Sequence, residues 1–293
     1  MTRIIQSLAE LSTSYDTLLC DLWGCLHNGR QPYPEAVAAL QGFRARGGAV
    51  ALLTNAPRPG RFVVEQLHRM GVPRDAWDLV VSSGDAAQIA MLRGAVGRHV
   101  HHIGPAKDDG FFTALPDEPD DLPTIVRVPL EEAEGIVCTG PFDELTETPE
   151  DYRDRFLLAR TRGLSLLCAN PDLVVDMGER RIYCAGALAV AYESMGGEVL
   201  YFGKPHPPIY DLVRRRLVSI GRSAETATML AVGDGILTDI RGGRGEGIDT
   251  LFVTGGLEAA RFGDDPAEPD PARLAGWLAQ QTEAPTMAIG RLR

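Results

Sequence analysis

The 293-residue chain is long enough for one large domain or two medium ones, and its 44% hydrophobic and 24% charged residues are typical of a globular protein. Its formal net charge of -11 leaves no excess of lysine and arginine to release counterions, which excludes nucleic acid and anionic membranes as partners. The sequence has five cysteines without a C-x-x-C pair, no signal peptide and no apolar run of the about 18 residues that a membrane helix needs. These features predict a cytoplasmic protein. Whether it forms a homodimer stays open.

Strands and helices alternate along the first part of the chain. The expected elements are a helix over 3–13, a strand from 18 to Asp21, a helix from Pro34 to about 46, a strand over 49–53, a helix over 62–70 and a strand over 78–84. The strand over 49–53 is apolar throughout, which indicates burial on both faces and therefore a parallel sheet. This order of elements is typical of a doubly wound, Rossmann-like α/β fold.

Residues 84–197 continue the alternation as a separate module. Its expected elements are strands over 99–104, 124–128, 135–140 and 164–170, helices over 149–162 and 185–196, and an exposed acidic, proline-rich loop over 116–123. After Gly197 the first pattern resumes. The elements expected there are a strand over 199–203, a helix over 207–220, a strand over 228–234, a helix over 238–245, a strand over 250–256 and an amphipathic segment over 274–278.

One domain interrupted by an inserted domain fits this order better than two domains in tandem. We therefore predict a core domain formed by residues 1–83 and 198–293, with an inserted α/β cap domain over 84–197. A cap of this kind closes over the edge of the core sheet and selects the substrate.

Polar side chains stand where the expected core strands end. They are Asp21, Thr54 with Asn55, Lys204, and Asp234 with Asp239. Parallel strands end at one edge of a sheet, where open α/β sheets bind ligands, so we expect these groups to converge. Taken alone, Asp21 is equally read as the cap of an ordinary strand-to-turn junction.

The predicted group of side chains suits a divalent cation together with an anion. Its ligands are hard oxygens without His or Cys spacing, which favours Mg²⁺. Mg²⁺ is usually held by one or two carboxylates plus a substrate phosphate, so phosphoryl chemistry matches. Lys204 would offset the charge of the phosphate and the carboxylates, and Thr54 would donate to a phosphate oxygen.

Four motifs occur in a fixed order along the chain, namely DLWGCL (21–26), LLTNAP (52–57), YFGKPHPPIY (201–210) and AVGDGILTDI (231–240). This order resembles that of the haloacid dehalogenase (HAD) superfamily of phosphohydrolases. The insert between the second and third motifs resembles the class IIA capped group. Its segments TGPFDE (139–144), CANPD (168–172) and CAGALA (184–189) are similar to that group's cap and its return to the core.

The resemblance implies a role for each residue of the site. Asp21 is implied as the nucleophile that forms an aspartyl-phosphate, and Lys204 as the group that orients Asp21 and the phosphate. Mg²⁺ is implied to bind the carboxylates of Asp21 and Asp234 and the backbone carbonyl of Trp23, with Asp239 supporting this shell. Thr54 and Asn55 are implied as phosphate-binding residues. The implied substrate is a small phosphorylated metabolite.

Trp23 departs from the pattern of the phosphatases that the chain resembles. They have there a second Asp, which is the general acid and base, whereas an indole donates only a weak N–H and accepts nothing. Losing such a group typically costs about 10²- to 10⁴-fold in rate. Three functions stay open. The first is a phosphatase that tolerates the loss, either because its substrates have acidic leaving groups or because a histidine substitutes. The others are a phospho-ligand-binding protein with little or no activity and a metal-independent dehalogenase, since haloacid dehalogenases also carry an aromatic residue here.

Two histidines and one turn are further candidates for the site. His27 and His206 are candidates to replace the missing proton transfer, although loop histidines without a role are common. Asn170 and Asp172 end a cap strand and are candidates for substrate contact, although Asn-Pro-Asp is also a common turn signal.

Overall fold

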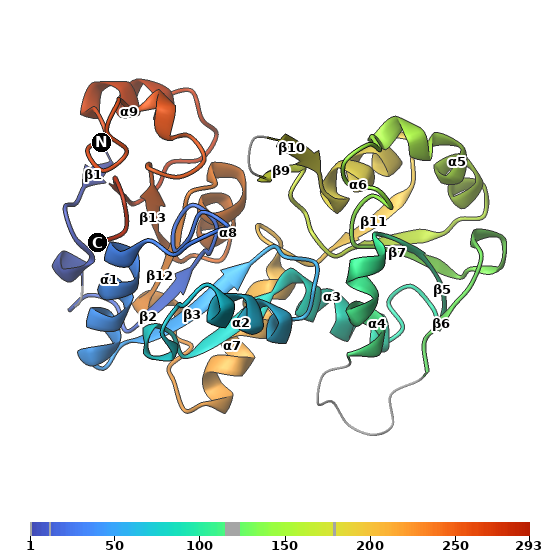
Figure 1. The fold of residues 1–293 in the computed structure, drawn as a ribbon, viewed down its shortest axis with the longest axis horizontal. Helices are drawn as coiled ribbons and strands as arrows, with labels where there is room; N and C mark the ends of the chain where they lie inside the picture. Colours follow the sequence, from blue (N-terminus) through green and yellow to red (C-terminus); the bar gives the residue numbers. More distant parts are fainter. Residues whose placement is uncertain (1, 12, 115–123, 178–179) are drawn as a thin grey trace. The chain divides into compact units, whose positions relative to one another are not determined.

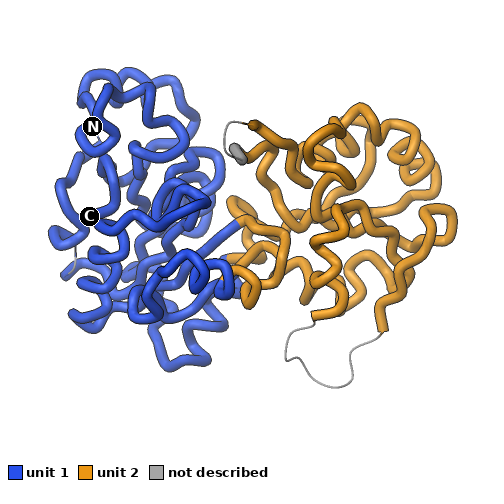
Figure 2. Tube along the Cα trace, in the orientation of Figure 1, with its two compact units in different colours: residues 1–54, 64–81, 210–293 blue, residues 55–63, 82–209 orange. Residues whose placement is uncertain are grey.

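The computed structural model describes residues 2–11, 13–114, 124–177 and 180–293 (Figure 1). Contacts divide the chain into two compact units (Figure 2). The first unit consists of Met1–Thr54, Val64–Val81 and Tyr210–Arg293, and the second of Asn55–Val63 and Ser82–Ile209. Within the described ranges, no helix combines the length and the apolar character needed to cross a membrane. The expected loop at 116–123 lies outside the described residues.

A seven-stranded sheet belongs to the first unit, in the order β1-β14-β13-β12-β2-β3-β4. Its strands are β1 (Arg3–Ile4), β2 (Thr17–Cys20), β3 (Ala49–Thr54), β4 (Leu79–Ser82), β12 (Met229–Gly233), β13 (Asp249–Val253) and β14 (Met287–Ile289). Neighbouring strands from β1 through β3 pair in parallel. Every residue of β2 is buried, as the sequence predicts for a strand inside a parallel sheet.

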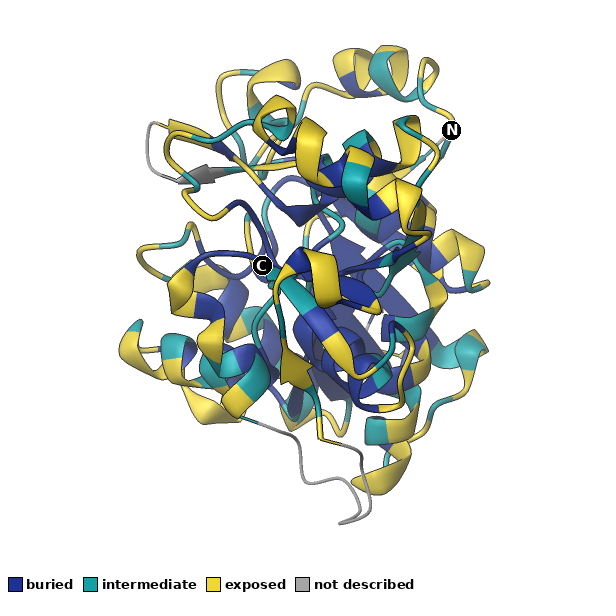
Figure 3. Cartoon of the chain, turned by 90° about the vertical axis from the view of Figure 1, so that its right-hand side faces the viewer, coloured by how far each residue is buried: buried dark blue, intermediate teal, exposed yellow. Residues whose placement is uncertain are grey.

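Helices connect the successive strands, as parallel pairing requires. They are α1 (Pro34–Ala45), α2 (Gly60–Arg69), α7 (Pro207–Ser219), α8 (Arg241–Gly245) and α9 (Pro271–Leu278), with shorter turns at η1 (Leu8–Leu11), η2 (Arg74–Ala76), η6 (Thr226–Thr228), η7 (Ile236–Ile240, a π-helix) and η8 (Ala259–Arg261). The helix α1 starts with Pro34, whose missing N–H costs nothing in the first turn, and buries Leu40 and Phe43. Figure 3 shows such buried faces in dark blue and the exposed faces of the helices in yellow.

The second unit contains its own parallel sheet, in the order β11-β8-β7-β5-β6, and a separate antiparallel hairpin. The strands are β5 (His99–Ile103), β6 (Val126–Arg127), β7 (Gly135–Cys138), β8 (Ser165–Cys168), β9 (Val174–Met177), β10 (Arg180–Tyr183) and β11 (Glu198–Tyr201). The helices are α3 (Ser83–Leu92), α4 (Gly110–Thr113), α5 (Arg153–Thr161) and α6 (Ala185–Ser194), with turns η3 (Ala106–Asp109), η4 (Leu130–Glu132) and η5 (Pro149–Tyr152). The predicted α/β fold with parallel sheets is confirmed.

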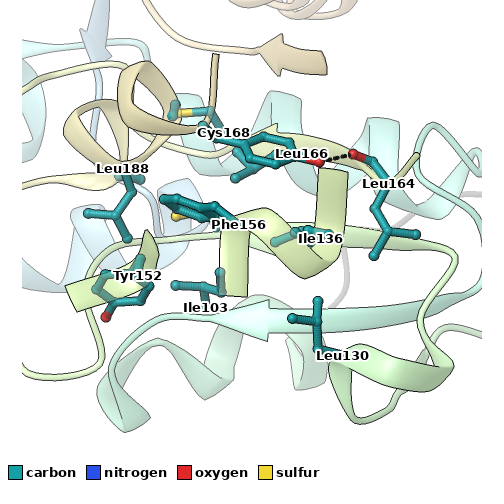
Figure 4. Close-up of a cluster of buried hydrophobic side chains, with 14 of the residues drawn as sticks. Ile103, Leu130, Ile136, Tyr152, Phe156, Leu164, Leu166, Cys168 and Leu188 are labelled. Carbon is teal, nitrogen blue, oxygen red and sulfur yellow. Dashed lines mark hydrogen bonds between the residues drawn. The ribbon is translucent and has the colours of Figure 1, made fainter. Parts of the chain in front are cut away.

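One buried apolar cluster of the second unit lies where α5 and α6 pack on β7 and β8 (Figure 4). Phe156 and Leu188 from the helices are fully buried with Ile136 and Leu166 from the strands. The hydroxyl of Tyr192 enters this cluster with its hydrogen bond satisfied, because it donates to the carbonyl of Leu164 at 2.5 Å.

One strand belongs to a different sheet from the expected one. The segment before Lys204 was expected to be a core strand, but β11 pairs in parallel with β8 in the sheet of the second unit. The pairing joins Glu198 to Ser165, whose hydroxyl donates to the Glu198 carboxylate at 2.6 Å. The prediction that Lys204 follows a strand of the core sheet is therefore wrong.

The expected helix over residues 3–13 is also wrong. Arg3–Ile4 forms β1, which pairs with β14 in the register Arg3↔Met287, and only the one turn η1 follows. A tertiary pairing has thus overridden the helical spacing of the apolar residues. The unit boundaries also differ from 1–83 with 198–293 and 84–197, and the division into a core and a cap stays a prediction.

Candidate active site

Three adjacent strands of the first unit's sheet carry polar side chains at their carboxyl ends. Asp21 follows β2, Thr54 is the last residue of β3, and Asp234 follows β12. Cys20 pairs with Leu52 on one side and with Val232 on the other. The Asp21 N–H continues this ladder by donating to the Val232 carbonyl at 2.8 Å. The parallel register therefore sets all three residues at one edge of the sheet.

Asp21 and Asp234 approach each other closely, and a thiol joins them. One carboxylate oxygen of each and the Sγ of Cys25 all lie within 4.8 Å of one another. The exposed fractions of the three residues are 9% for Asp21, 8% for Asp234 and 1% for Cys25. Burial, followed by the negative charges of Asp234 and Asp21, raises the pKa of the Cys25 thiol well above its usual value. We did not predict Cys25 as part of the site, although it stands within the DLWGCL motif.

A backbone amide binds the Asp234 carboxylate, and two glycines leave the space that it occupies. Its Oδ2 accepts a hydrogen bond from the Leu257 N–H at 2.7 Å. A Cβ atom on Gly24 would lie 2.0 Å from this oxygen, and one on Gly256 would lie 2.2 Å from it. Gly24 also has a φ of +74°, which side chains rarely adopt. The glycine after Trp23 is therefore required by the turn and by the neighbouring carboxylate.

Asp239 supports the turn that follows β12. Its Oδ2 accepts hydrogen bonds from the Gly235 N–H and from the Thr238 hydroxyl, each at 3.2 Å. It is 4% exposed and lies in the π-helix η7. Asp239 is not a member of the cluster formed by Asp21, Cys25 and Asp234, and its support of a metal shell stays a prediction.

The side chain of Trp23 packs against its own loop. A Cβ atom on Gly29 would lie 2.2 Å from the indole Cη2, so the indole lies directly over that glycine. Its edge meets the His27 ring, with the ring centroids 5.8 Å apart and the planes at 79°. His27 is 3% exposed, and its Nδ1 accepts a hydrogen bond from the Gly29 N–H at 3.1 Å, which leaves the proton of the neutral ring on Nε2.

In the second unit, the side chain of Asn55 binds the backbone of Lys204. Its Oδ1 accepts a hydrogen bond from the Lys204 N–H at 2.7 Å. Its Nδ2 donates to the Lys204 carbonyl at 3.0 Å and to the Asp172 carboxylate at 2.8 Å. Both amide hydrogens are thus used, so this side chain has no donor left for a phosphate.

The other predicted residues of the second unit have local partners. Asn170 Oδ1 accepts from the Asp172 N–H at 2.9 Å, which is the turn geometry expected of Asn-Pro-Asp. His206 stacks on Tyr201, with centroids 4.6 Å apart and planes at 7°. Lys204 itself is 3% exposed. The structure brings together Asn55, Asp172 and the Lys204 backbone, and places His206 against an aromatic ring.

A cation beside the candidate site was also missed. Arg291 follows β14, and its guanidinium lies over the Tyr33 ring at 5.3 Å from the centroid. Its Nε is buried and has no hydrogen-bond partner among the described residues. Burial raises the pKa of Tyr33, Arg291 opposes this, and Cys25 and Asp234 add to it. Arg291 stands near the end of the sequence, outside any motif, so no local pattern indicates it.

Comparison with known proteins places these features in a family context. The family model of haloacid dehalogenase-like hydrolases matches residues 18–114, and a second, HAD-hydrolase-like model matches residues 201–276. This chain is similar to a haloacid dehalogenase-like hydrolase from Brucella suis 1330, whose crystal structure is known. The two sequences are 39% identical, the TM-score is 0.82, and the match covers 99% of this chain and 100% of that one.

Two curated phosphatases are more distant relatives. The D-glycerol 3-phosphate phosphatase of Mycobacterium tuberculosis is 26% identical over 258 residues, which cover 86% of this chain and 67% of that protein. The 5'-nucleotidase YutF of Bacillus subtilis is 25% identical over 276 residues, which cover 90% of this chain and 98% of that protein.

Proposed function

Because the chain belongs to the haloacid dehalogenase-like hydrolases, we propose that it is a phosphatase acting on a small phosphorylated metabolite, with Asp21 as its nucleophile. The observation that carries the proposal is the buried pair of Asp21 and Asp234 at the carboxyl edge of the sheet. Two carboxylates so close together repel each other unless a cation lies with them. The names of the curated relatives support phosphate esters as the substrate class.

Mg²⁺ fits the donors of this site. The carboxylates of Asp21 and Asp234 offer the hard, anionic oxygens that Mg²⁺ prefers, and the backbone carbonyl of Trp23 is the third proposed ligand. When bound, the ion neutralises the charge that develops on the phosphoryl group. Asp239 contributes indirectly, since it holds the turn that carries Asp234.

In the proposed reaction, an Asp21 oxygen forms a bond to phosphorus while the bond between phosphorus and the leaving oxygen breaks. Water then attacks the aspartyl-phosphate, which releases phosphate and restores the carboxylate. Thr54, at the end of β3, is proposed to donate to a phosphate oxygen. Lys204 stays a predicted phosphate-binding residue, and we propose that Asn55 acts by positioning it.

The weak point of this reaction is proton transfer to the leaving group. The Trp23 indole accepts no proton, and the Nδ1 of His27 is occupied by the Gly29 N–H. We therefore propose substrates with acidic leaving groups, such as acyl or aryl phosphates, which need little protonation. The same observation favours a second candidate, a phospho-ligand-binding protein that hydrolyses slowly or not at all.

One set of assays distinguishes these functions. The purified chain with Mg²⁺ is offered acetyl phosphate, p-nitrophenyl phosphate and a 2-haloacid, beside an Asp21→Asn variant. Phosphate release that disappears with EDTA and in this variant supports the phosphatase. Asp264→Asn is the matched control, because Asp264 is exposed and outside the site, and it should leave the rate unchanged.

The other outcomes overturn the phosphatase. Phosphate bound at one equivalent per chain without turnover supports the binding protein. Halide release that is independent of metal supports a dehalogenase, in which Asp234 would have no evident use.

A further inference from the structure

We infer that Cys25 makes the carboxylate pair of Asp21 and Asp234 a site for a thiophilic divalent cation, such as Zn²⁺ or Cd²⁺, with the Cys25 sulfur as a ligand. This inference goes beyond the proposed function, because it rests on the position of three side chains and not on turnover. All three belong to the first unit, so one compact body supplies the ligands.

The distances suit a single ion. Bond lengths of about 2.3 Å to sulfur and about 2.0–2.2 Å to oxygen place two ligand atoms of one tetrahedral Zn²⁺ about 3.4–3.6 Å apart. The three candidate atoms lie within 4.8 Å of one another. These separations therefore have to close by at most about 1.4 Å for all three atoms to reach one ion.

The segments that carry the three side chains are already held in place. The backbone of Asp21 is fixed because its N–H donates to the Val232 carbonyl, and the Asp234 carboxylate is fixed by the Leu257 N–H. The turn that carries Cys25 is closed on itself, because the Leu26 N–H donates to the Leu22 carbonyl at 2.8 Å. Binding would therefore require little ordering of the chain.

The Cys25 thiol has no hydrogen-bond partner among the described residues, in contrast to the thiols of Cys20 and Cys168. Among the described residues, the Cys20 thiol donates to the Asp21 carbonyl and the Cys168 thiol donates to the Asn170 carbonyl. No such bond is found for Cys25 in the same part of the chain, although it is 1% exposed. Its sulfur lies beside two carboxylates instead.

The chemistry of sulfur decides which cations benefit. Carboxylate oxygens suit Mg²⁺, whereas a thiolate selects softer ions. On coordination, the thiol proton leaves to solvent and a bond forms between sulfur and the metal. With two carboxylates and one thiolate, a thiophilic ion should bind far more tightly than Mg²⁺ and compete with it for the same oxygens.

The test is a titration of the full-length, metal-free protein with Cd²⁺, followed by the ultraviolet charge-transfer absorption of the cadmium–thiolate bond. We expect this absorption to saturate at one equivalent per chain. Cys25→Ser should abolish it and weaken Cd²⁺ binding by at least about 10- to 100-fold, the loss that removal of even a supporting group causes. Cys168→Ser, which removes a buried thiol of the second unit, should leave it intact.

Several results would overturn the inference. They are Cd²⁺ binding to the unaltered protein without the absorption, retention of the absorption in Cys25→Ser, and its loss in Cys168→Ser. Should Cys25→Ser fail to fold, Asp234→Asn provides a second arm, in which unchanged Cd²⁺ affinity contradicts the shared site. The cadmium–thiolate absorption requires no substrate. A protein that shows this absorption but has no phosphatase activity would therefore refute the proposed function and leave the metal site standing.

Discussion

Trp23 stands two residues after the proposed nucleophile, with its indole lying over Gly29. We expect Trp23→Asp to raise phosphate release from alkyl phosphates by up to about 10²-fold, because a carboxyl group there supplies the missing proton transfer. Steady-state rates with an alkyl and an acyl phosphate measure the effect, which should be larger for the alkyl ester. Trp23→Phe keeps an aromatic side chain and should not raise the rate. A fall in rate for Trp23→Asp would mean that the indole itself assists the reaction.

Gly24 gives a second test at this scale. Gly24→Ala should cost about 1–2 kcal/mol for its left-handed backbone and should also displace the Asp234 carboxylate, so that Mg²⁺ binding is lost. Gly71→Ala is the matched control, since Gly71 has a similar φ of +79° and nothing within 4 Å of the added Cβ. The Gly71→Ala variant should lose stability but keep its Mg²⁺ affinity. Calorimetric Mg²⁺ titration and thermal unfolding separate the two effects, and equal Mg²⁺ affinity in both variants would contradict the proposed crowding.

Single residues differ in how far their sequence neighbours indicate their role. Asp21 and Asp234 were predicted because each follows an apolar strand within a motif. Cys25 was not, because a cysteine in an apolar turn resembles any small hydrophobic residue. Only its approach to Asp234, far along the chain, makes it a candidate ligand.

Among the elements, the turn over 170–172 and the segment at Asn55 are joined by a buried amide. Asn55→Asp should destabilise the second unit by about 3 kcal/mol, because a new carboxylate would face the Lys204 carbonyl and the Asp172 carboxylate. Adding Asp172→Asn should recover part of this loss, since an amide at 172 can donate to the new carboxylate.

A double-mutant cycle of unfolding free energies measures this coupling. The single variant Asp172→Asn provides the remaining corner. Strictly additive changes would show that the bond between Asn55 and Asp172 contributes nothing to the second unit.

The elements were predicted well wherever an apolar strand or an amphipathic helix has a length close to the average. The strand β14 was missed because its three residues are too few to show an alternating pattern. The strands β9 and β10 were missed because each of them pairs only with the other. The strand β11 was found, but an apolar parallel strand has the same pattern in any sheet, so its partner β8 was not predictable.

For the molecule as a whole, the carboxylate pair of Asp21 and Asp234 is expected to couple thermal stability to the binding of a metal ion. Without a cation, the charges of Asp21 and Asp234 repel each other, so Mg²⁺ should raise the midpoint of thermal unfolding and EDTA should reverse the rise. Asp234→Asn should raise the midpoint of the metal-free protein, by about 2–4 °C for each kcal/mol of repulsion removed, and should abolish the response to Mg²⁺.

The control for this prediction is Asp264→Asn, which removes an exposed negative charge. It should leave both the midpoint and the response to Mg²⁺ unchanged. A lower midpoint in Asp234→Asn without metal would mean that the carboxylate stabilises the fold more through the Leu257 N–H than it destabilises it by repulsion.

The chain passes between the two units at residues 54/55, 63/64, 81/82 and 209/210, and the strands that complete the first sheet come last. On a ribosome, the whole second unit through Ile209 emerges before β12, β13 and β14 exist. The second unit is therefore expected to fold during synthesis, whereas β2 gains its partner β12 only after the second unit has been made. We therefore expect the unfinished first unit to be the more aggregation-prone part of the nascent chain.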